Sequence, residues 1–201
     1  MSYSALILAG GRGSRMGYRE KALMDFNGKP LIAYVIERLE KVVDNIIISV
    51  RDKEQGELLE LHVPGYRFAC DKYNNIGPIS GMLSGLSLCA DEYCFAAACD
   101  MPFINHNVVK MLFKESEHYE AAIPRHDDGF LEPLHAVYRC EPMIKEIKKA
   151  IEADETILLA PIFKLNVNYV GIEEIKKIDP MLRTFMNINT YEDMQLLSNT
   201  I

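Results

Sequence analysis

The sequence predicts an α/β fold, built as a doubly wound, mostly parallel sheet with helices on both faces. Three observations lead to this class. Short apolar runs alternate with amphipathic helical patterns through residues 1–120. Some of these runs, such as the continuous Ile-Ile-Ile-Ser-Val segment at 46–50, are typical of parallel strands that are buried on both sides. In the second half, a polar turn at 126–129 between two strand-like segments predicts a small antiparallel excursion.

The same patterns predict the individual elements. We expect strands, each a short and mostly apolar run, at 5–9, 46–50, 66–70, 93–99, 120–124 and 134–139. Apolar residues recur at helical spacing in four segments, which are 31–42, 78–89, 107–117 and 142–152. Residues 158–170 give no clear pattern, and 185–188 is expected to be a short strand. A last helix is expected to begin at Thr190 and Asp193, which have capping-box-like spacing.

The composition is that of an ordinary globular protein. The 201 residues are 49% hydrophobic and 25% charged, which suits one large domain with a single core. The formal net charge of −7 argues against nucleic acid or an anionic membrane as a partner. The five cysteines have neither C-x-x-C nor zinc-site spacing, which favours buried thiols in a reducing compartment. Residues 1–9 lack a charged leader, and no apolar run approaches the roughly 20 residues of a membrane span, so we expect a cytoplasmic protein.

A glycine-rich stretch, Leu-Ile-Leu-Ala-Gly-Gly-Arg-Gly-Ser-Arg-Met-Gly at 6–17, follows the first expected strand. Because α/β proteins bind ligands at the carboxyl ends of their strands, this loop is a candidate ligand site. Gly10, Gly11 and Gly13 allow backbone N–H groups to approach an anion closely. Cations gathered here in an acidic chain point to a phosphate ligand, and they are Arg12, Arg15 and Lys21.

The loop fits neither of two common phosphate-binding motifs. The loop does not end in the Gly-Lys-Ser/Thr of a Walker A motif. Met16 occupies the position of the third glycine in a dinucleotide-binding fingerprint. An NAD-dependent oxidoreductase is therefore disfavoured. A glycine-rich surface turn with solvated arginines remains the structural alternative.

Three segments together resemble nucleotidyltransferases of the sugar-nucleotide and cofactor type. They are the stretch 8–17, Lys-Ala-Leu at 21–23 and Asn-Gly-Lys-Pro-Leu at 27–31. The resemblance implies a single nucleotidyltransferase domain over residues 1–201. It also implies that Leu8, Ala9, Gly10 and Gly11 border the nucleotide, while Arg15 and Lys21 hold its phosphates as catalytic cations.

Two carboxylates follow expected strands. Asp100 ends the strand at 93–99, where a carboxylate is a natural Mg²⁺ ligand, although it could instead cap the next helix. The aspartate of the family's Asp-x-Pro motif binds the metal, so the resemblance makes Asp100 the magnesium ligand and a catalytic, nucleotide-binding residue. Asp71 follows the strand at 66–70 and could accept the N–H groups of a guanine edge, hold a ribose hydroxyl, or be a solvated loop acid.

Within these enzymes the chain looks like the molybdenum cofactor guanylyltransferases. The resemblance is carried by Gly-Pro-Ile-Ser-Gly-Met at 77–82, Pro-Leu-His-Ala-Val-Tyr at 133–138 and Phe-Met-Asn-Ile-Asn-Thr-Tyr-Glu-Asp at 185–193. It implies magnesium-dependent transfer of GMP from GTP to the terminal phosphate of molybdopterin. Asn187 and Asn189 are then candidates for the pterin side, or else turn and cap residues. The family also allows transient contact with other cofactor-biosynthesis proteins or acceptor enzymes.

Several alternatives stay open. Arg51 occupies a place where some members carry an asparagine that helps to bind the nucleotide, so that contact is not carried over. Cytidylyltransferase relatives share the loop, which leaves CTP or another phosphorylated acceptor as an alternative, beside a non-catalytic nucleotide-binding relative. His135 invites a catalytic role, but a histidine within an apolar strand is expected to be a hydrogen-bonded structural residue.

Overall fold

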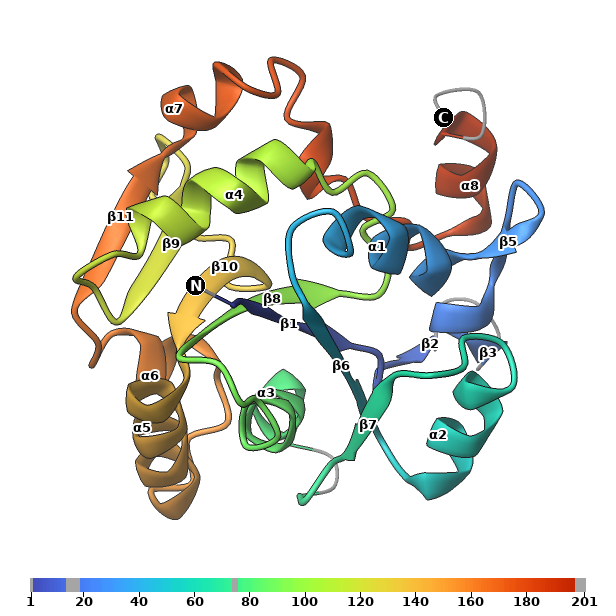
Figure 1. Ribbon diagram of the computed structural model, residues 1–201, viewed down its shortest axis with the longest axis horizontal. Coiled ribbons are helices and arrows are strands. Elements are labelled where there is room, and N and C mark those ends of the chain that lie inside the picture. Colours follow the sequence, from blue (N-terminus) through green and yellow to red (C-terminus); the bar gives the residue numbers. More distant parts are fainter. Residues whose placement is uncertain (1, 14–18, 74–75, 198–201) are drawn as a thin grey trace.

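A seven-stranded sheet forms the centre of the molecule in the computed structural model, which describes residues 2–13, 19–73 and 76–197 (Figure 1). Across the sheet the strands follow the order β11-β9-β10-β8-β1-β6-β7. In chain order they are β1 (Ser4–Leu8), β6 (Asn45–Val50), β7 (Arg67–Cys70), β8 (Tyr93–Ala98), β9 (Ala121–Arg125), β10 (His135–Arg139) and β11 (Val167–Gly171). Six of the seven strands expected from the sequence form, each end within one residue of the expected bound.

Four neighbouring strands run parallel, because β1 pairs with β6 and with β8, and β6 pairs with β7. The strand β10 is inserted antiparallel between β8 and β9, and β11 returns parallel to β9. The predicted doubly wound sheet with an antiparallel excursion is therefore confirmed. The apolar, β-branched sequence of β6 follows from its place inside the sheet, where five of its six residues are buried.

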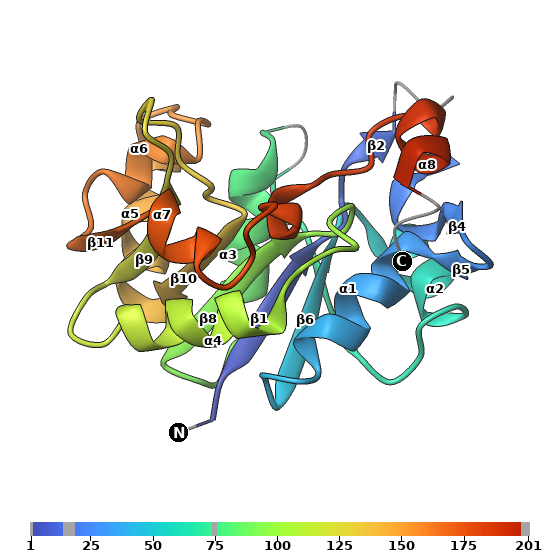
Figure 2. The ribbon, with the colours of Figure 1, turned by 90° about the horizontal axis from the view of Figure 1, so that it is seen from above.

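Helices cover both faces of the sheet, as Figures 1 and 2 show. On one face of the sheet, strand side chains pack with those of α1, α2, α4 and α7 in one hydrophobic cluster. On the opposite face, they pack with those of α3, α5 and α6 in a second cluster. The helices are α1 (Leu31–Leu39), α2 (Lys53–Glu60), α3 (Pro78–Leu86), α4 (His106–Glu115), α5 (Cys140–Glu152), α6 (Leu159–Ile162), α7 (Ile172–Lys176) and α8 (Tyr191–Leu197). No helix among the described residues is long and apolar enough to span a bilayer.

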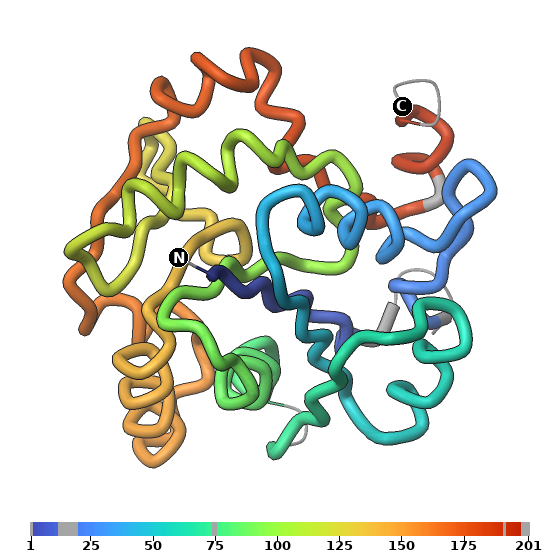
Figure 3. Tube along the Cα trace, in the orientation of Figure 1, coloured from blue at the N-terminus to red at the C-terminus, as the bar shows by residue number. Residues whose placement is uncertain are grey.

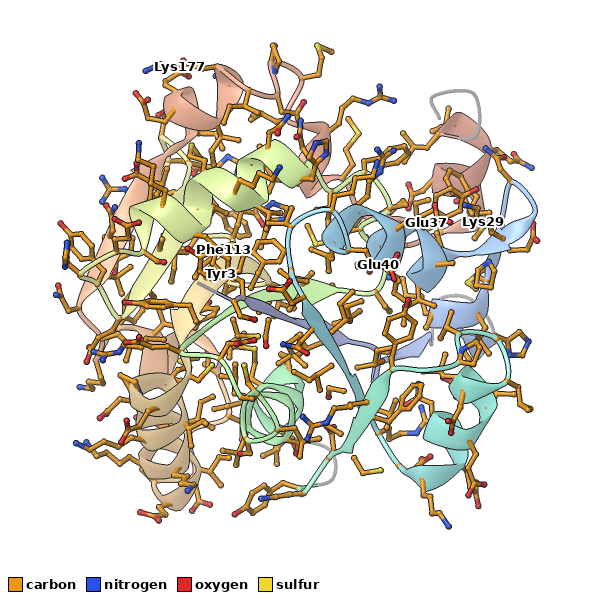
Figure 4. All side chains as sticks on the ribbon, viewed as in Figure 1. Tyr3, Lys29, Glu37, Glu40, Phe113 and Lys177 are labelled. Carbon is orange, nitrogen blue, oxygen red and sulfur yellow. The ribbon has the colours of Figure 1, made fainter. Side chains whose placement is uncertain are left out.

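Aromatic packing fixes α4 against the start of β1. Figure 4 shows Tyr3 beside Phe113, and their rings stack with centroids 4.1 Å apart. Lys29 of β5 (Lys29–Pro30) and Glu37 of α1 form an exposed ion pair, with Nζ and Oε1 2.5 Å apart (Figure 4). Such exposed pairs add little to stability, so the stacked rings are the stronger of the two contacts.

A third, smaller hydrophobic cluster joins the two ends of the described chain. It contains Phe26 of the β4–β5 hairpin, Leu31 of α1, Ile188 of the segment before α8 and Met194 of α8 itself. The tube in Figure 3 shows α8 beside the first helix and hairpin. The hairpins are β2 (Arg12–Gly13) with β3 (Arg19–Glu20) and β4 (Asp25–Phe26) with β5 (Lys29–Pro30).

One predicted strand is wrong. Residues 185–188 do not join the sheet; the 3-10 turn η3 (Arg183–Phe185) leads into an irregular segment. The Ile188 N–H donates a 2.9 Å hydrogen bond to the carbonyl of Asp100, two residues beyond the end of β8, and no ladder with the sheet forms among the described residues of this segment. The expected start of α8 is confirmed: the Asp193 N–H donates to Thr190 Oγ1, and the Thr190 N–H donates to Asp193 Oδ2. The helices α2, α6 and α7, the strand β11 and both hairpins were not predicted.

The helix α3 packs against β1 at a position where only glycine fits. A Cβ added to Gly85 would lie 2.2 Å from Leu6 Cδ1 and 2.9 Å from Leu6 Cγ. Leu6 is completely buried, so its side chain has little room to move. The close approach of α3 to the sheet therefore depends on this glycine.

We expect Gly85→Ala to lower the free energy of unfolding by about 1–3 kcal/mol, because the new methyl group overpacks the core at Leu6. The matched control is Gly171→Ala, where an added Cβ meets nothing within 4 Å and the change is expected to stay within about 0.5 kcal/mol. Urea unfolding at constant m-value measures both. Equal midpoints for the two variants would contradict the packing argument.

Candidate functional site

The carboxyl ends of β1, β6, β7 and β8 surround a cavity of about 430 Å³. Parallel strands bring these ends to one edge of the sheet, which is the usual ligand site of doubly wound folds. The lining comprises Leu8, Gly10, Gly11, Lys21, Ser49, Arg51, Asp71, Gly77, Pro78, Gly81, Ala98, Cys99, Asp100 and Leu134. A cavity of this size accommodates a small organic ligand.

Two glycines make room for the cavity wall. A Cβ on Gly10 would lie 3.2 Å from the Arg51 backbone nitrogen and 3.5 Å from Asp71 Oδ2. A Cβ on Gly81, in the first half of α3, would lie 2.6 Å from Ser49 Oγ. The backbones of the first loop and of α3 can therefore approach β6 closely only because these positions lack side chains.

Lys21, Asp100 and Asn189 meet at one end of the cavity. The Lys21 ammonium donates to Asp100 Oδ2 and, at 2.7 Å, to Asn189 Oδ1. The second carboxylate oxygen, Asp100 Oδ1, is buried and has no hydrogen-bond partner among the described residues. A buried acceptor without a partner is costly in a folded protein, so Asp100 has coordination capacity left for a ligand.

Asp71 lies at the other end of the cavity. Its Oδ1 accepts a 3.2 Å hydrogen bond from Ser49 Oγ, and its Oδ2 lies beside Gly10. Burial raises the pKa of this carboxyl group, while the hydrogen bond from Ser49 and the charge of Arg51 act in the opposite direction. The site therefore presents a partly desolvated carboxylate to whatever occupies the cavity.

Arg51 also lines the cavity, but its guanidinium is engaged by acids. Its Nη2 donates to Glu20 Oε1 and its Nε to Asp52 Oδ2, both at 2.8 Å. The hydrogen bond to Glu20 raises the pKa of Arg51 against the opposing effect of burial. The positive charge of Arg51 is thus largely neutralised within the protein.

The cavity brings together most of the residues predicted from the sequence. Leu8, Gly10, Gly11, Lys21, Asp71 and Asp100 all line it. Ala9 does not: its side chain is in the core, and its carbonyl accepts a 2.9 Å hydrogen bond from Gln55 Nε2. Asn187 is exposed, whereas Asn189 contacts Lys21. Arg15 lies outside the described residues.

Other site residues were missed. Ser49 was the one polar residue within an otherwise apolar strand, which was a usable signal. Glu20 and Gln55 carried no such signal, because their roles depend on contacts between segments more than 30 residues apart in the sequence, with separations of 31, 35 and 46.

His135 is structural, as expected. It is fully buried, with its ring edge-on to Phe95 and Phe185 at centroid distances of 5.0 and 4.9 Å. The Thr184 hydroxyl accepts from the Asn105 N–H and pairs with His135 Nε2 at 3.0 Å. Burial lowers the pKa of His135 to about 3, so the ring is neutral.

Comparison with known proteins places the chain among nucleotidyltransferases. The family model for the MobA-like NTP transferase domain matches residues 5–161. A Methanosarcina mazei protein named probable molybdenum cofactor guanylyltransferase is 44% identical over 198 residues, covering 96% of this chain and 88% of that protein. A Methanosarcina acetivorans protein of the same name is 43% identical over 207 residues, covering 100% and 92%.

Solved structures show the same fold. The crystal structure of molybdopterin-guanine dinucleotide biosynthesis protein A from Archaeoglobus fulgidus matches with a TM-score of 0.84 and 33% identity, covering 98% of this chain and 97% of that chain. The 4-diphosphocytidyl-2C-methyl-D-erythritol synthase of Anaerococcus prevotii matches with a TM-score of 0.70 at 16% identity, covering 99% and 95%. The second likeness extends to the fold alone.

The raised pKa of Asp71 predicts a pH-dependent effect of Asp71→Asn on stability. A carboxyl group whose pKa is raised by folding binds its proton more tightly in the folded state. Its contribution to the free energy of unfolding therefore falls as pH rises from its ordinary value of 3.8 through the raised folded value. We expect the asparagine variant to gain stability relative to the parent protein as pH rises through this range.

Urea unfolding of both proteins across this range measures the difference. Asp44→Asn, at an exposed position, is the matched control and should show no comparable trend. A constant difference between Asp71→Asn and the parent protein at every pH would contradict the argument.

Proposed function

The chain belongs to the MobA-like NTP transferase family, and from this premise we propose that it transfers GMP from GTP to the terminal phosphate of molybdopterin, with release of pyrophosphate. The observation that carries the proposal is the cavity with Lys21, Asp100 and Asn189 at one end and Asp71 at the other. One end offers a cation and a metal-type carboxylate for phosphates. The other offers acceptors for a base or ribose.

The reaction needs little acid–base chemistry from the protein. A phosphate monoester has a second pKa of about 6 and is largely dianionic at neutral pH, so the attacking oxygen needs no general base. The terminal phosphate oxygen of molybdopterin forms a bond to the α-phosphorus of GTP. The bond between that phosphorus and the oxygen that bridges it to the β-phosphorus breaks, and pyrophosphate leaves. The enzyme's contribution is to align the two substrates and to offset their negative charge.

The residues present fit a bound Mg²⁺. Asp100 Oδ1 is buried and has no partner among the described residues, which is the state expected of a metal ligand. Three or more His, Cys, Asp or Glu side chains do not converge on one point in the described part of the chain. That pattern suits Mg²⁺, which commonly binds one or two carboxylates together with substrate phosphates and water. When bound, the ion would supply neutralisation of phosphate charge.

We propose that Lys21 neutralises the departing pyrophosphate. Its ammonium is held at the cavity by Asp100 and Asn189, so its position is set before a ligand arrives. Asn189 is the better supported of the two pterin-side candidates, because it touches Lys21, whereas Asn187 is exposed. The role of Arg15 as a second phosphate-binding cation rests on the sequence resemblance. The five free cysteines fit a cytoplasmic setting.

We expect Asp100→Ala to reduce magnesium-dependent pyrophosphate release from GTP and molybdopterin by about a hundredfold or more while the protein stays folded. The buried oxygen that would bind the metal is lost in this variant. Asp44→Ala, at an exposed position, is the control and should retain activity. Full activity of Asp100→Ala at every Mg²⁺ concentration would remove the metal assignment.

Base choice provides a second test. Guanine presents N1–H and N2–H₂ donors that match a site of acceptors, whereas cytosine presents an acceptor at N3. Leaving two buried acceptors unpaired costs roughly 1–3 kcal/mol each, so we expect GTP to be preferred over CTP by about a hundredfold or more.

Rates of pyrophosphate release with each nucleotide, with molybdopterin as acceptor, measure this preference. Asp71→Ala should reduce the preference for GTP if Asp71 binds the base. If Asp71 binds the ribose, the variant should bind GTP and CTP more weakly by the same factor. A higher rate with CTP would replace the guanylyltransferase by the cytidylyltransferase alternative.

A further inference from the structure

Glu20 is held at both carboxylate oxygens, by Arg51, which lines the cavity, and by Gln55 of α2. Its Oε1 accepts a 2.8 Å hydrogen bond from Arg51 Nη2, and its Oε2 accepts a 2.6 Å hydrogen bond from Gln55 Nε2. The Glu20 and Arg51 side chains are only 22% and 24% exposed. Charge-assisted bonds of this length in a partly desolvated setting are among the stronger polar contacts in proteins. We call Glu20, Arg51 and Gln55 the clamp.

Gln55 anchors the clamp to the rigid part of the fold. It is 2% exposed, and all of its hydrogen-bonding groups point inward. Its Oε1 accepts from the Arg51 N–H at 2.7 Å, and its Nε2 also donates to the Ala9 carbonyl at 2.9 Å. Its own N–H is capped by Asp52 Oδ1 at 2.8 Å. The clamp is therefore fixed to the ends of β1 and β6 and to the first turn of α2.

Lys21 follows Glu20 directly in the chain. Glu20 is the residue before the 3-10 turn η2 (Lys21–Leu23), and Lys21 extends from that turn to Asp100 and Asn189. The two adjacent side chains thus make contacts with different partners, Glu20 with Arg51 and Gln55, and Lys21 with Asp100 and Asn189. Fixing Glu20 fixes the backbone from which Lys21 extends.

We infer that Glu20, held by Arg51 and Gln55, is a positioning residue that keeps Lys21 in place to receive phosphate. The inference rests on the proposed function, in which Lys21 meets the triphosphate. A long lysine side chain loses less conformational entropy on binding when its backbone and its contacts are already fixed in the free protein. Arg51 acts through Glu20. Because its guanidinium contacts Glu20 and Asp52, it holds the loop in position and does not bind the nucleotide.

A double-mutant cycle tests this inference with inorganic pyrophosphate and Mg²⁺ as the probe. Calorimetric dissociation constants are measured for the parent protein, Glu20→Ala, Lys21→Ala and the double variant. We expect Glu20→Ala to weaken pyrophosphate binding roughly tenfold in the parent background. In the Lys21→Ala background the same change should have less than about a twofold effect, because the residue through which Glu20 acts is already gone.

Two controls separate positioning from a general loss of structure. Affinity for GMP, which lacks the β- and γ-phosphates, should change by less than about twofold in Glu20→Ala. Glu57→Ala removes an exposed acid of α2 that pairs with Lys53 at 3.3 Å, and it should leave pyrophosphate binding unchanged. Arg51→Ala should reproduce the selective loss seen with Glu20→Ala.

The outcomes are decisive in both directions. Additive losses in the double variant, or equal losses for pyrophosphate and GMP, would overturn the positioning role and make Glu20 a structural residue. Unchanged pyrophosphate binding in Lys21→Ala would overturn it too. Failure of the parent protein to transfer GMP to molybdopterin would reject the proposed function, while a non-additive cycle in the same protein would still support the positioning of Lys21.

Discussion

The arrangement of the site depends on Asp100, which joins distant parts of the chain just after β8. Its carboxylate holds Lys21 from the first loop, and its carbonyl accepts from the Ile188 N–H. Lys21 in turn binds Asn189. Breaking a partly buried ion pair by removing one partner leaves the other charge desolvated, so these contacts are mutually dependent. The arrangement explains why the segment around 188 runs beside the cavity instead of joining the sheet.

Much of the fold could be predicted because burial on two faces leaves a strong pattern. The continuous apolar run of β6 and the alternation of strand and helix through residue 120 indicated the sheet directly. The failure at 185–188 has the opposite cause. Met186 and Ile188 pack in the small third cluster, and Phe185 packs against the first cluster and His135, so hydrophobicity there did not indicate a strand.

The candidate site was predictable where a motif fell on a strand end, and not where it depended on tertiary contacts. Lys21, Asp71 and Asp100 stand at such ends or in the glycine-rich segment, and all three line the cavity. Arg51 could be located from the sequence but its partners could not, because Glu20 lies 31 residues earlier in the chain. The polar residues that organise a loop leave no periodic signal, since their roles are set by contacts with residues elsewhere in the chain.

The pairing of Lys21 with Asn189 spans 168 residues, and that of Lys21 with Asp100 spans 79. Contacts of such high sequence separation carry a larger loop-closure cost than contacts within the local strand–helix units. During synthesis from the amino end, the sheet up to β8 can assemble while residue 189 has yet to leave the ribosome. A nascent chain can therefore form this part of the sheet before Lys21 meets Asn189, and the contacts around Lys21 are complete only after residue 189 has been made.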